Sequence, residues 1–247
     1  MSDNPAALQR LLLTDSKYCD NKEQLRKLFN SDIEDHVITV MHEDGLYRHL
    51  RFRDPAHGMY WFDLITWPGN LTINGDMGTY TFARVEDMFK FFTGYINTGY
   101  WAEKERSRGR SELKEHDGDS FKAWVVQDFW EYSRDMDAKK AKRWWASIRE
   151  HVFARYASHD TDFREGCNAA MDEIIDDGAS PGGHYEDLWE NSWAKYPWHF
   201  EWSLAAIVTG IRTYNAVKKA EFLSEAVADP EGRRLAAAAV ALAEAQK

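Results

Sequence analysis

Residues 36–82 divide into short runs that predict β-strands: residues 36–42 are rich in β-branched side chains, residues 46–53 alternate between hydrophobic and polar, and residues 59–67 are rich in aromatic side chains. In the second run, Leu50 and Phe52 fall on one face, and Arg51 and Arg53 fall on the other. Turn-forming pairs that contain glycine separate the runs, which favours short hairpin connections. The segment is therefore expected to form a five-stranded antiparallel meander. Its strands are expected at residues 36–42, 46–53, 59–67, 71–73 and 79–82.

A period of three to four residues replaces this alternation on both sides of the strands, and it predicts helices. Residues 22–29 follow Asn21, a suitable N-cap, and residues 85–92 carry aromatic side chains that can cover the sheet. Asp137 can cap a helix over residues 138–156, whose apolar stripe consists of Trp144, Ile148, Val152 and Tyr156. Further helices are expected around residues 121–129, 160–176, 185–193 and 202–226, and after residue 229.

The segment 102–119 differs from both patterns, because Leu113 is its one large apolar residue among many charged ones. Such a composition is typical of a linker or an exposed loop. The chain is therefore expected to be an α+β protein in three parts. These are an α+β domain at residues 1–101, with an antiparallel sheet flanked by helices, a charged linker or loop at 102–119, and a tryptophan-rich helical domain at 120–247.

The composition bears on whether the protein contacts a membrane and on the compartment in which it acts. The 247 residues are 44% hydrophobic, yet no apolar run approaches the roughly 18 residues of a membrane helix. The N-terminus lacks the basic region of a signal peptide. Cys19 and Cys167 are far apart and are expected to be reduced thiols. A cytoplasmic protein without membrane contact is therefore expected.

The net charge is −10, which argues against binding nucleic acid through the overall field and suits a basic protein partner. A local basic cluster, Lys139-Lys140 with Lys142-Arg143, precedes Trp144. Charge and stacking there could contact a nucleic acid. A solvated helix start is the favoured interpretation of this cluster, and direct binding of nucleic acid is not expected.

Asp63 and Asp76 are the carboxylates with the strongest case for chemistry. Asp63 lies inside the aromatic strand, where it either faces solvent or is buried and paired with Arg51 or Arg53. Asp76 lies in a glycine-containing loop that could bind an anion, although a hairpin turn is favoured. The histidines lack metal-site spacing, and Cys167 has no histidine near it in sequence. No metal and no cofactor are therefore expected.

The tryptophans have two interpretations, and both stay open. They either build a helical core or face outward as anchors of a protein interface, where Trp, Tyr and Arg are enriched. Trp144 and Trp145 are adjacent, so a helix directs them to faces about 100° apart. If they are anchors, the interface also includes a nearby acidic run. Its expected residues are then Trp144, Trp145, Trp189, Trp193, Asp172, Glu173, Asp176 and Asp177.

Residues 58–92 carry a motif that reads YWFDLITWPG, then GDMGTY, then DMF and FF. It resembles a group of uncharacterised phage and prophage accessory proteins, which supply no catalytic residues to transfer. The resemblance implies an accessory protein of a mobile element that acts in the bacterial cytoplasm. Small acidic accessory proteins of mobile elements often inhibit host defence, and anti-CRISPR proteins are an example.

The expected function is therefore that of a phage-encoded, anti-CRISPR-like inhibitor. It would bind a host protein or ribonucleoprotein defence complex and block or displace its components. One alternative is an enzyme that acts on a nucleotide or nucleic acid through Asp63 and Asp76. The other is a phage structural or assembly component.

Overall fold

A computed structural model describes residues 22–107, 113–154, 167–169, 171, 172, 174, 180 and 193–228. The chain divides into two compact units. The first, here called the helical unit, comprises Met1–Glu23 and Lys114–Pro197. The second, here called the sheet unit, comprises Gln24–Leu113 and Trp198–Lys247. The helical unit is therefore largely an insertion between two parts of the sheet unit.

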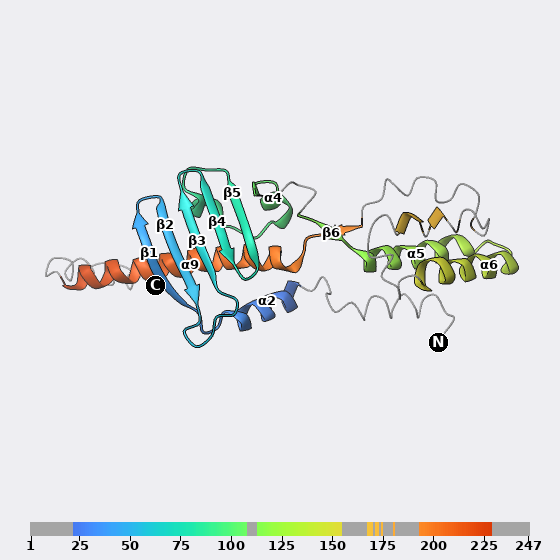
Figure 1. Cartoon of the computed structure of the whole chain (residues 1–247), viewed down its shortest axis with the longest axis horizontal. Helices are drawn as coiled ribbons and strands as arrows, with labels where there is room; N and C mark the ends of the chain where they lie inside the picture. The colour runs from blue at the N-terminus through green and yellow to red at the C-terminus, as the bar shows by residue number, and fades with distance from the viewer. Residues whose placement is uncertain are drawn as a thin grey trace, which may run out of the picture. The chain divides into compact units, whose positions relative to one another are not determined.

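Five antiparallel strands in sequence order form the main sheet of the sheet unit (Figure 1). They are β1 (Val37–Asp44), β2 (Tyr47–Arg53), β3 (Phe62–Trp67), β4 (Asn70–Gly75) and β5 (Gly78–Ala83). Gly45, Gly69 and Gly78 adopt positive φ angles at the hairpin turns, a conformation that glycine adopts without strain. The α+β class and the predicted five-stranded meander are confirmed.

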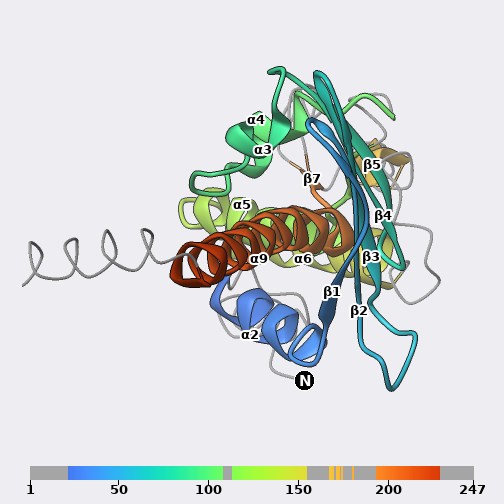
Figure 2. The same ribbon diagram turned by 90° about the vertical axis from the view of Figure 1, so that its left-hand side faces the viewer.

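One face of this sheet packs against α9 (Trp198–Ala228), as Figure 2 shows. Gly210 of α9 comes so close that an added Cβ would lie 2.7 Å from Leu64 Cδ1. The helices α2 (Lys22–Asp32), α3 (Met88–Phe91) and α4 (Thr98–Ala102) lie on the same side of the sheet. Alternate strand residues supply the buried layer, namely Leu50, Phe52, Phe62, Leu64, Leu71, Ile73, Tyr80 and Phe82.

The position of α9 differs from the expected domain boundaries, which placed it in a helical domain at residues 120–247. It belongs to the sheet unit because its apolar residues complete that core. Phe200 contacts the rings of Tyr80 and Phe82 at 5.1 and 6.3 Å between centroids. The sheet core is thus built from two segments that are far apart in the sequence.

The expected linker 102–119 is partly ordered against the sheet. Ala83 N donates to Lys104 O at 3.0 Å, and Arg106 N donates to Thr81 O at 2.7 Å. Leu113 is buried. Residues 104–106 therefore cover the outer edge of β5 instead of forming an exposed loop.

In the part of the helical unit that the structure describes, α5 (Gly118–Ser133) precedes α6 (Ala138–Ile148), and α6 continues as a π-helical turn, η1 (Arg149–Phe153). Asp137 caps α6 as predicted, because its carboxylate accepts hydrogen bonds from the amides of Lys139 and Lys140. Three residues of the predicted stripe are fully buried, and Tyr156 lies outside the described residues. The three are Trp144, Ile148 and Val152.

The chain enters and leaves the helical unit through a two-stranded antiparallel ribbon. Its strands are β6 (Glu115–His116) and β7 (Ala194–Lys195), and Glu115 pairs with Lys195. A hydrogen bond from Asp117 N to Trp193 O at 2.9 Å extends this pairing. The two ends of the insertion are therefore adjacent in space.

Gly75 lies where β4 approaches the start of β3 most closely. An added Cβ would lie 2.2 Å from the carbonyl oxygen of Trp61 and 2.8 Å from Phe62 Cα, and both are backbone atoms. We expect Gly75→Ala to lower the free energy of unfolding by about 2 kcal/mol in urea denaturation. Gly94→Ala is the control, because the space around Gly94 is open. An equal loss in both variants would contradict the steric explanation.

Candidate functional site

The face of the sheet opposite α9 is here called the open face (Figure 1). Strand pairing arranges its residues in rows across the five strands. Among these positions Asp63 alone is buried, and the set contains neither lysine nor glutamate. The open face consists of Val37 and Arg53, then Thr39, Arg51, Asp63, Asn74 and Thr79, then His42, His49, Ile65, Thr72 and Thr81, then Asp44, Tyr47, Trp67, Asn70 and Ala83.

Asp63 is held by two neighbours on β2. Arg51 Nε donates to Asp63 Oδ1 and Arg51 Nη2 donates to Oδ2, both at 2.8 Å. His49 Nε2 lies 2.9 Å from Oδ2 and donates, since an ionised carboxylate can only accept. Burial raises the pKa of Asp63, but the hydrogen bonds and charges of Arg51 and His49 outweigh it and hold the pKa below its ordinary value. Of the alternatives that the sequence left open, the structure shows the buried, paired carboxylate, with Arg51 and not Arg53 as its partner.

Arg51 is fixed from a second side by an aromatic ring. Its guanidinium carbon lies 5.6 Å from the ring centre of Trp61, which is a cation–π contact. Hydrogen bonding to Asp63 raises the pKa of Arg51, so the guanidinium stays charged. Its side chain is nevertheless 40% exposed. The arrangement presents a positioned cation to solvent without requiring the side chain to be ordered on binding.

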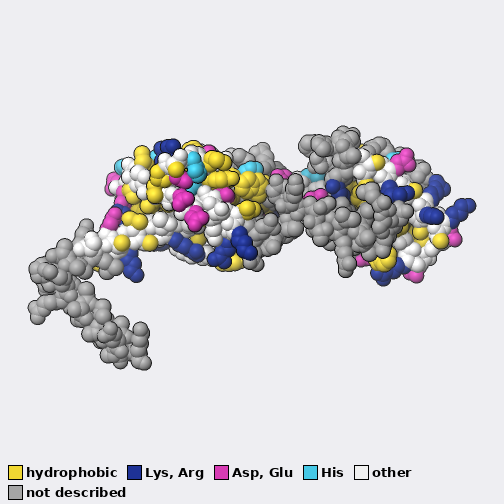
Figure 3. Space-filling model, turned by 90° about the horizontal axis from the view of Figure 1, so that it is seen from below, with side chains coloured by type: hydrophobic (Ala, Val, Ile, Leu, Met, Phe, Trp, Pro, Cys, Tyr) yellow, Lys and Arg dark blue, Asp and Glu magenta, His cyan; other side chains and the backbone are white. Residues whose placement is uncertain are grey.

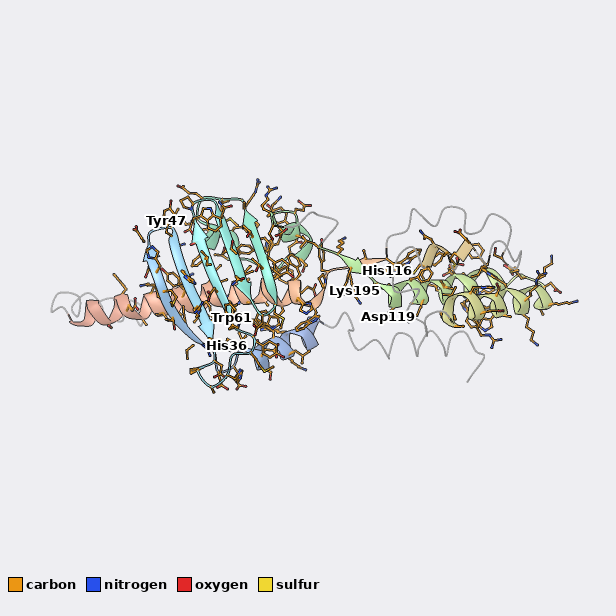
Figure 4. All side chains as sticks on the ribbon, in the orientation of Figure 1. His36, Tyr47, Trp61, His116, Asp119 and Lys195 are labelled. Atoms are coloured by element: carbon orange, nitrogen blue, oxygen red, sulfur yellow. The ribbon has the colours of Figure 1, made fainter. Side chains whose placement is uncertain are left out.

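Two exposed aromatic side chains lie at one end of the open face. Tyr47 at the start of β2 is 53% exposed, and Trp67 at the end of β3 is 37% exposed. Figure 4 shows Tyr47 and Trp61 at opposite ends of the sheet, so aromatic residues flank the open face along the strands. Sequence analysis did not single out Tyr47, Trp67 or His49. Extending the alternation of Arg51 and Arg53 back to position 47 would have placed Tyr47 and His49 on this face.

Asp76 lies in the turn between β4 and β5 and is exposed, and its amide donates to Trp61 O at 3.2 Å. The predicted hairpin turn is confirmed. A general base needs a lone pair that can reach the substrate's proton. Both oxygens of Asp63 are instead occupied by Arg51 and His49. The geometry therefore lends no support to catalysis by Asp63 with Asp76.

Trp144 and Trp145 lie in the core of the helical unit, with 0% and 8% exposure. Phe129 of α5 contacts both rings, at 5.0 and 4.8 Å between centroids. Trp193 is half-buried and packs on Phe121 at 4.9 Å. For Trp144 and Trp145 the structure therefore favours the core interpretation over the outward-facing one, because one aromatic ring on α5 covers both of them.

The acidic run is described in part. Asp172 is exposed, as a negative surface patch would require. Trp189, Glu173, Asp176 and Asp177 lie outside the described residues.

The basic start of α6 is exposed to solvent. Lys139, Lys140 and Lys142 are all exposed, and Asp137 caps the helix beside them. Figure 3 shows Lys and Arg side chains at one end of the helical unit with acidic side chains among them. This mixture fits the favoured interpretation, a solvated helix start.

Cys167 has a histidine neighbour that sequence analysis missed. Its Sγ lies 3.1 Å from His116 Nε2, although the two residues are 51 positions apart. The sequence shows no histidine neighbour for Cys167, and the fold supplies one, since β6 brings His116 to it. Cys167 is only 1% exposed and packs with Phe121 and Met171 in the core.

Burial makes a thiol slow to react, whatever its neighbour. In a Cys19→Ser background, we expect Cys167 to react with Ellman's reagent at least about 100-fold more slowly in the native protein than in guanidinium chloride. Absorbance at 412 nm measures the rate. Rapid stoichiometric labelling of the native protein would show instead that the thiol is accessible.

No described helix has the length and apolar character needed to cross a membrane. Within the same residues, no three histidine, cysteine or carboxylate side chains gather in a metal-binding arrangement. No family model matches the chain, and neither the curated proteins nor the solved structures include a significant match.

Proposed function

We propose that this protein acts by binding another protein through the open face of its sheet. The observation that carries this proposal is the composition of that face. Interface centres are enriched in Trp, Tyr and Arg and depleted in Lys and Glu. The open face has Trp67, Tyr47 and Arg51 but no lysine or glutamate, in a chain that is 29% charged.

The rigidity of the sheet supports the same role. A buried aromatic and aliphatic layer fixes the strands from behind, and Asp63 with Trp61 fixes Arg51 from in front. A surface that is ordered before binding loses little conformational entropy when the partner docks.

The partner we propose is a host protein or ribonucleoprotein defence complex, which this protein would inhibit by blocking or displacing a component. The resemblance to phage and prophage accessory proteins supports this narrower proposal. The strands β3, β4 and β5 lie within the segment that carries that motif, and they form much of the open face. The net charge of −10 would favour a basic surface on the partner.

The test compares two pairs of exposed aromatic residues. The open-face variant is Tyr47→Ser with Trp67→Ser, at 53% and 37% exposure. The control is Tyr132→Ser with Trp130→Ser on α5, at 55% and 43% exposure. Each tagged protein is used for affinity capture from a bacterial host lysate, followed by quantitative mass spectrometry.

We expect the wild type and the control to capture the same protein in similar amounts. The open-face variant should capture at least about 10-fold less of that protein. Equal capture by all three proteins, or a loss confined to the control, would overturn the proposal. Circular dichroism of each variant shows that the comparison is made between folded proteins.

A further inference from the structure

The two outer edges of the sheet differ in whether other backbone segments cover them. Residues 104–106 cover the outer edge of β5, with Ala83 N donating to Lys104 O and Arg106 N donating to Thr81 O. At the other edge, β1 pairs with β2 on its inner side. Within the described ranges, no residue pairs with its outer side. Seven of its eight residues are exposed, as is typical of an edge whose backbone N–H and C=O groups can pair with another strand.

β1 lacks several of the features that usually protect an exposed edge, although it has a bulge and the inward-facing charge of Glu43. Proteins shorten such strands or place lysine or proline in them. β1 has eight residues and contains neither. A bulge lies between Val40 and His42, so the part before it stays regular. Val37, Val40 and Met41 are 51%, 39% and 51% exposed. This combination of regular backbone and exposed apolar side chains is typical of a strand that accepts a further strand.

The helix behind the sheet extends beyond β1. Tyr214 and Lys218 of α9 both bond to Glu43 on β1, so α9 reaches the sheet edge at these residues. The helix continues to Ala228, which adds about 15 Å at 1.5 Å per residue. One further strand needs only about 4.8 Å. Figure 1 shows α9 running past β1.

The overhanging part of α9 carries an exposed aromatic ring. Phe222 is 69% exposed and follows Lys218 by four residues, so it lies on the face that meets the sheet. Val40 lies on the α9 side of β1, because it pairs with the buried Leu50. A strand added beside β1 would cover both Val40 and Phe222. The helical layer is thus wider than the sheet it supports.

The charges around β1 indicate the character of the added strand. Glu34 and Asp35 are exposed before β1, and Asp44 is exposed at its end. An extended segment with basic residues on both sides of an apolar centre would match these charges. Pairing of two copies centred on Thr39 would instead bring Asp35 of one copy towards Glu43 of the other, and like charges facing across a ladder are unfavourable.

We propose that the outer edge of β1 accepts an extended strand of the partner protein, with β-branched residues at its centre and lysine or arginine at both ends. The strand would pair with the β1 backbone and pack on Val40 and Phe222. This inference rests on the proposed function in that the protein binds another protein. It concerns a different surface from the open face.

The experiment uses the full chain and a fluorescein-labelled peptide, Lys-Arg-Val-Thr-Val-Ile-Lys-Arg. Two N-methylated versions remove the amide protons from one or the other set of alternate central residues. In strand pairing, only one set donates to the neighbour, so one version should bind and the other should lose at least about 10-fold in affinity. A peptide with Glu-Asp ends should also bind at least about 10-fold more weakly. Fluorescence anisotropy measures all four affinities.

Protein variants assign the binding to the edge. Val40→Lys and Phe222→Ser should each weaken peptide binding about 10-fold. Tyr47→Ser with Trp67→Ser should leave peptide binding unchanged. A failure of the edge proposal can therefore be told apart from a failure of the open-face proposal. Hydrogen exchange should show new protection within β1 when the peptide is bound.

Three outcomes would overturn the inference. The first is no saturable binding below about 1 mM peptide. The second is equal binding of both N-methylated peptides, or no effect of Val40→Lys and Phe222→Ser. The third is a stable dimer in sedimentation with β1 protected from exchange before peptide is added, which would identify a second copy as the occupant.

Discussion

Replacing Trp144 with alanine is expected to lower the free energy of unfolding of the helical unit by about 4 kcal/mol. The side chain has no exposed surface and packs edge-on against Phe129. The substitution removes a large apolar ring and leaves a cavity, because Phe129 and Ile148 can only partly close the space. Far-UV circular dichroism during urea denaturation measures the effect without relying on indole fluorescence.

The matched control is Trp130→Ala, which removes a tryptophan that is 43% exposed on α5. It should cost less than about 1 kcal/mol, since little apolar surface is lost from the core. If Trp144→Ala left stability unchanged and abolished capture of a partner, Trp144 would be an exposed anchor after all. The comparison therefore separates the two interpretations of the tryptophans by measurement.

Asp63→Asn is expected to destabilise the sheet unit by about 2 kcal/mol at neutral pH, because its hydrogen-bond partners are partly screened by solvent. The substitution removes a buried anion and leaves the partly exposed Arg51 and His49 with a neutral amide. The pKa of Asp63 in the folded protein lies below its ordinary value of 3.8. The stabilisation by the carboxylate is therefore fully present above that ordinary value and is lost as the pH falls through the lower folded pKa.

The measurement is urea unfolding of the wild type and Asp63→Asn from pH 7 down to about pH 3. The two free energies should differ most at neutral pH and converge in acid. Asp44→Asn, which changes an exposed carboxylate of the open face, is the control and should follow the wild type throughout. A difference between the wild type and Asp63→Asn that stayed constant across the pH range would contradict an ionised role for Asp63.

The meander could be predicted from the sequence because its determinants are local. Alternation sets the faces, and glycine at positions 45, 69 and 78 sets the turns. The register of neighbouring strands determines which residues face each other across them. Arg51 could therefore be named from the sequence as a possible partner of Asp63. Local patterns of this kind need no knowledge of the rest of the chain.

The partner of α9 could not be predicted in the same way. Helical periodicity shows that a helix has an apolar face, but it does not say which layer that face will cover. The same limit applies to Cys167 and His116, which are separated by 51 positions and meet only in the folded helical unit. It also applies to Trp144 and Trp145, because adjacent residues can both be buried when another helix covers two sides.

The separation of β5 from α9 along the chain has a consequence for synthesis on the ribosome. The apolar side of the sheet is made first, and the helix that shields it is made only after the whole insertion. At ordinary translation rates this interval is on the order of ten seconds. During that time Leu64 and Phe82 lack their cover, while the ribosome is still making the inserted segment. We therefore expect the nascent chain to expose the apolar side of its sheet until the last helix emerges, which is the interval in which aggregation is most favoured.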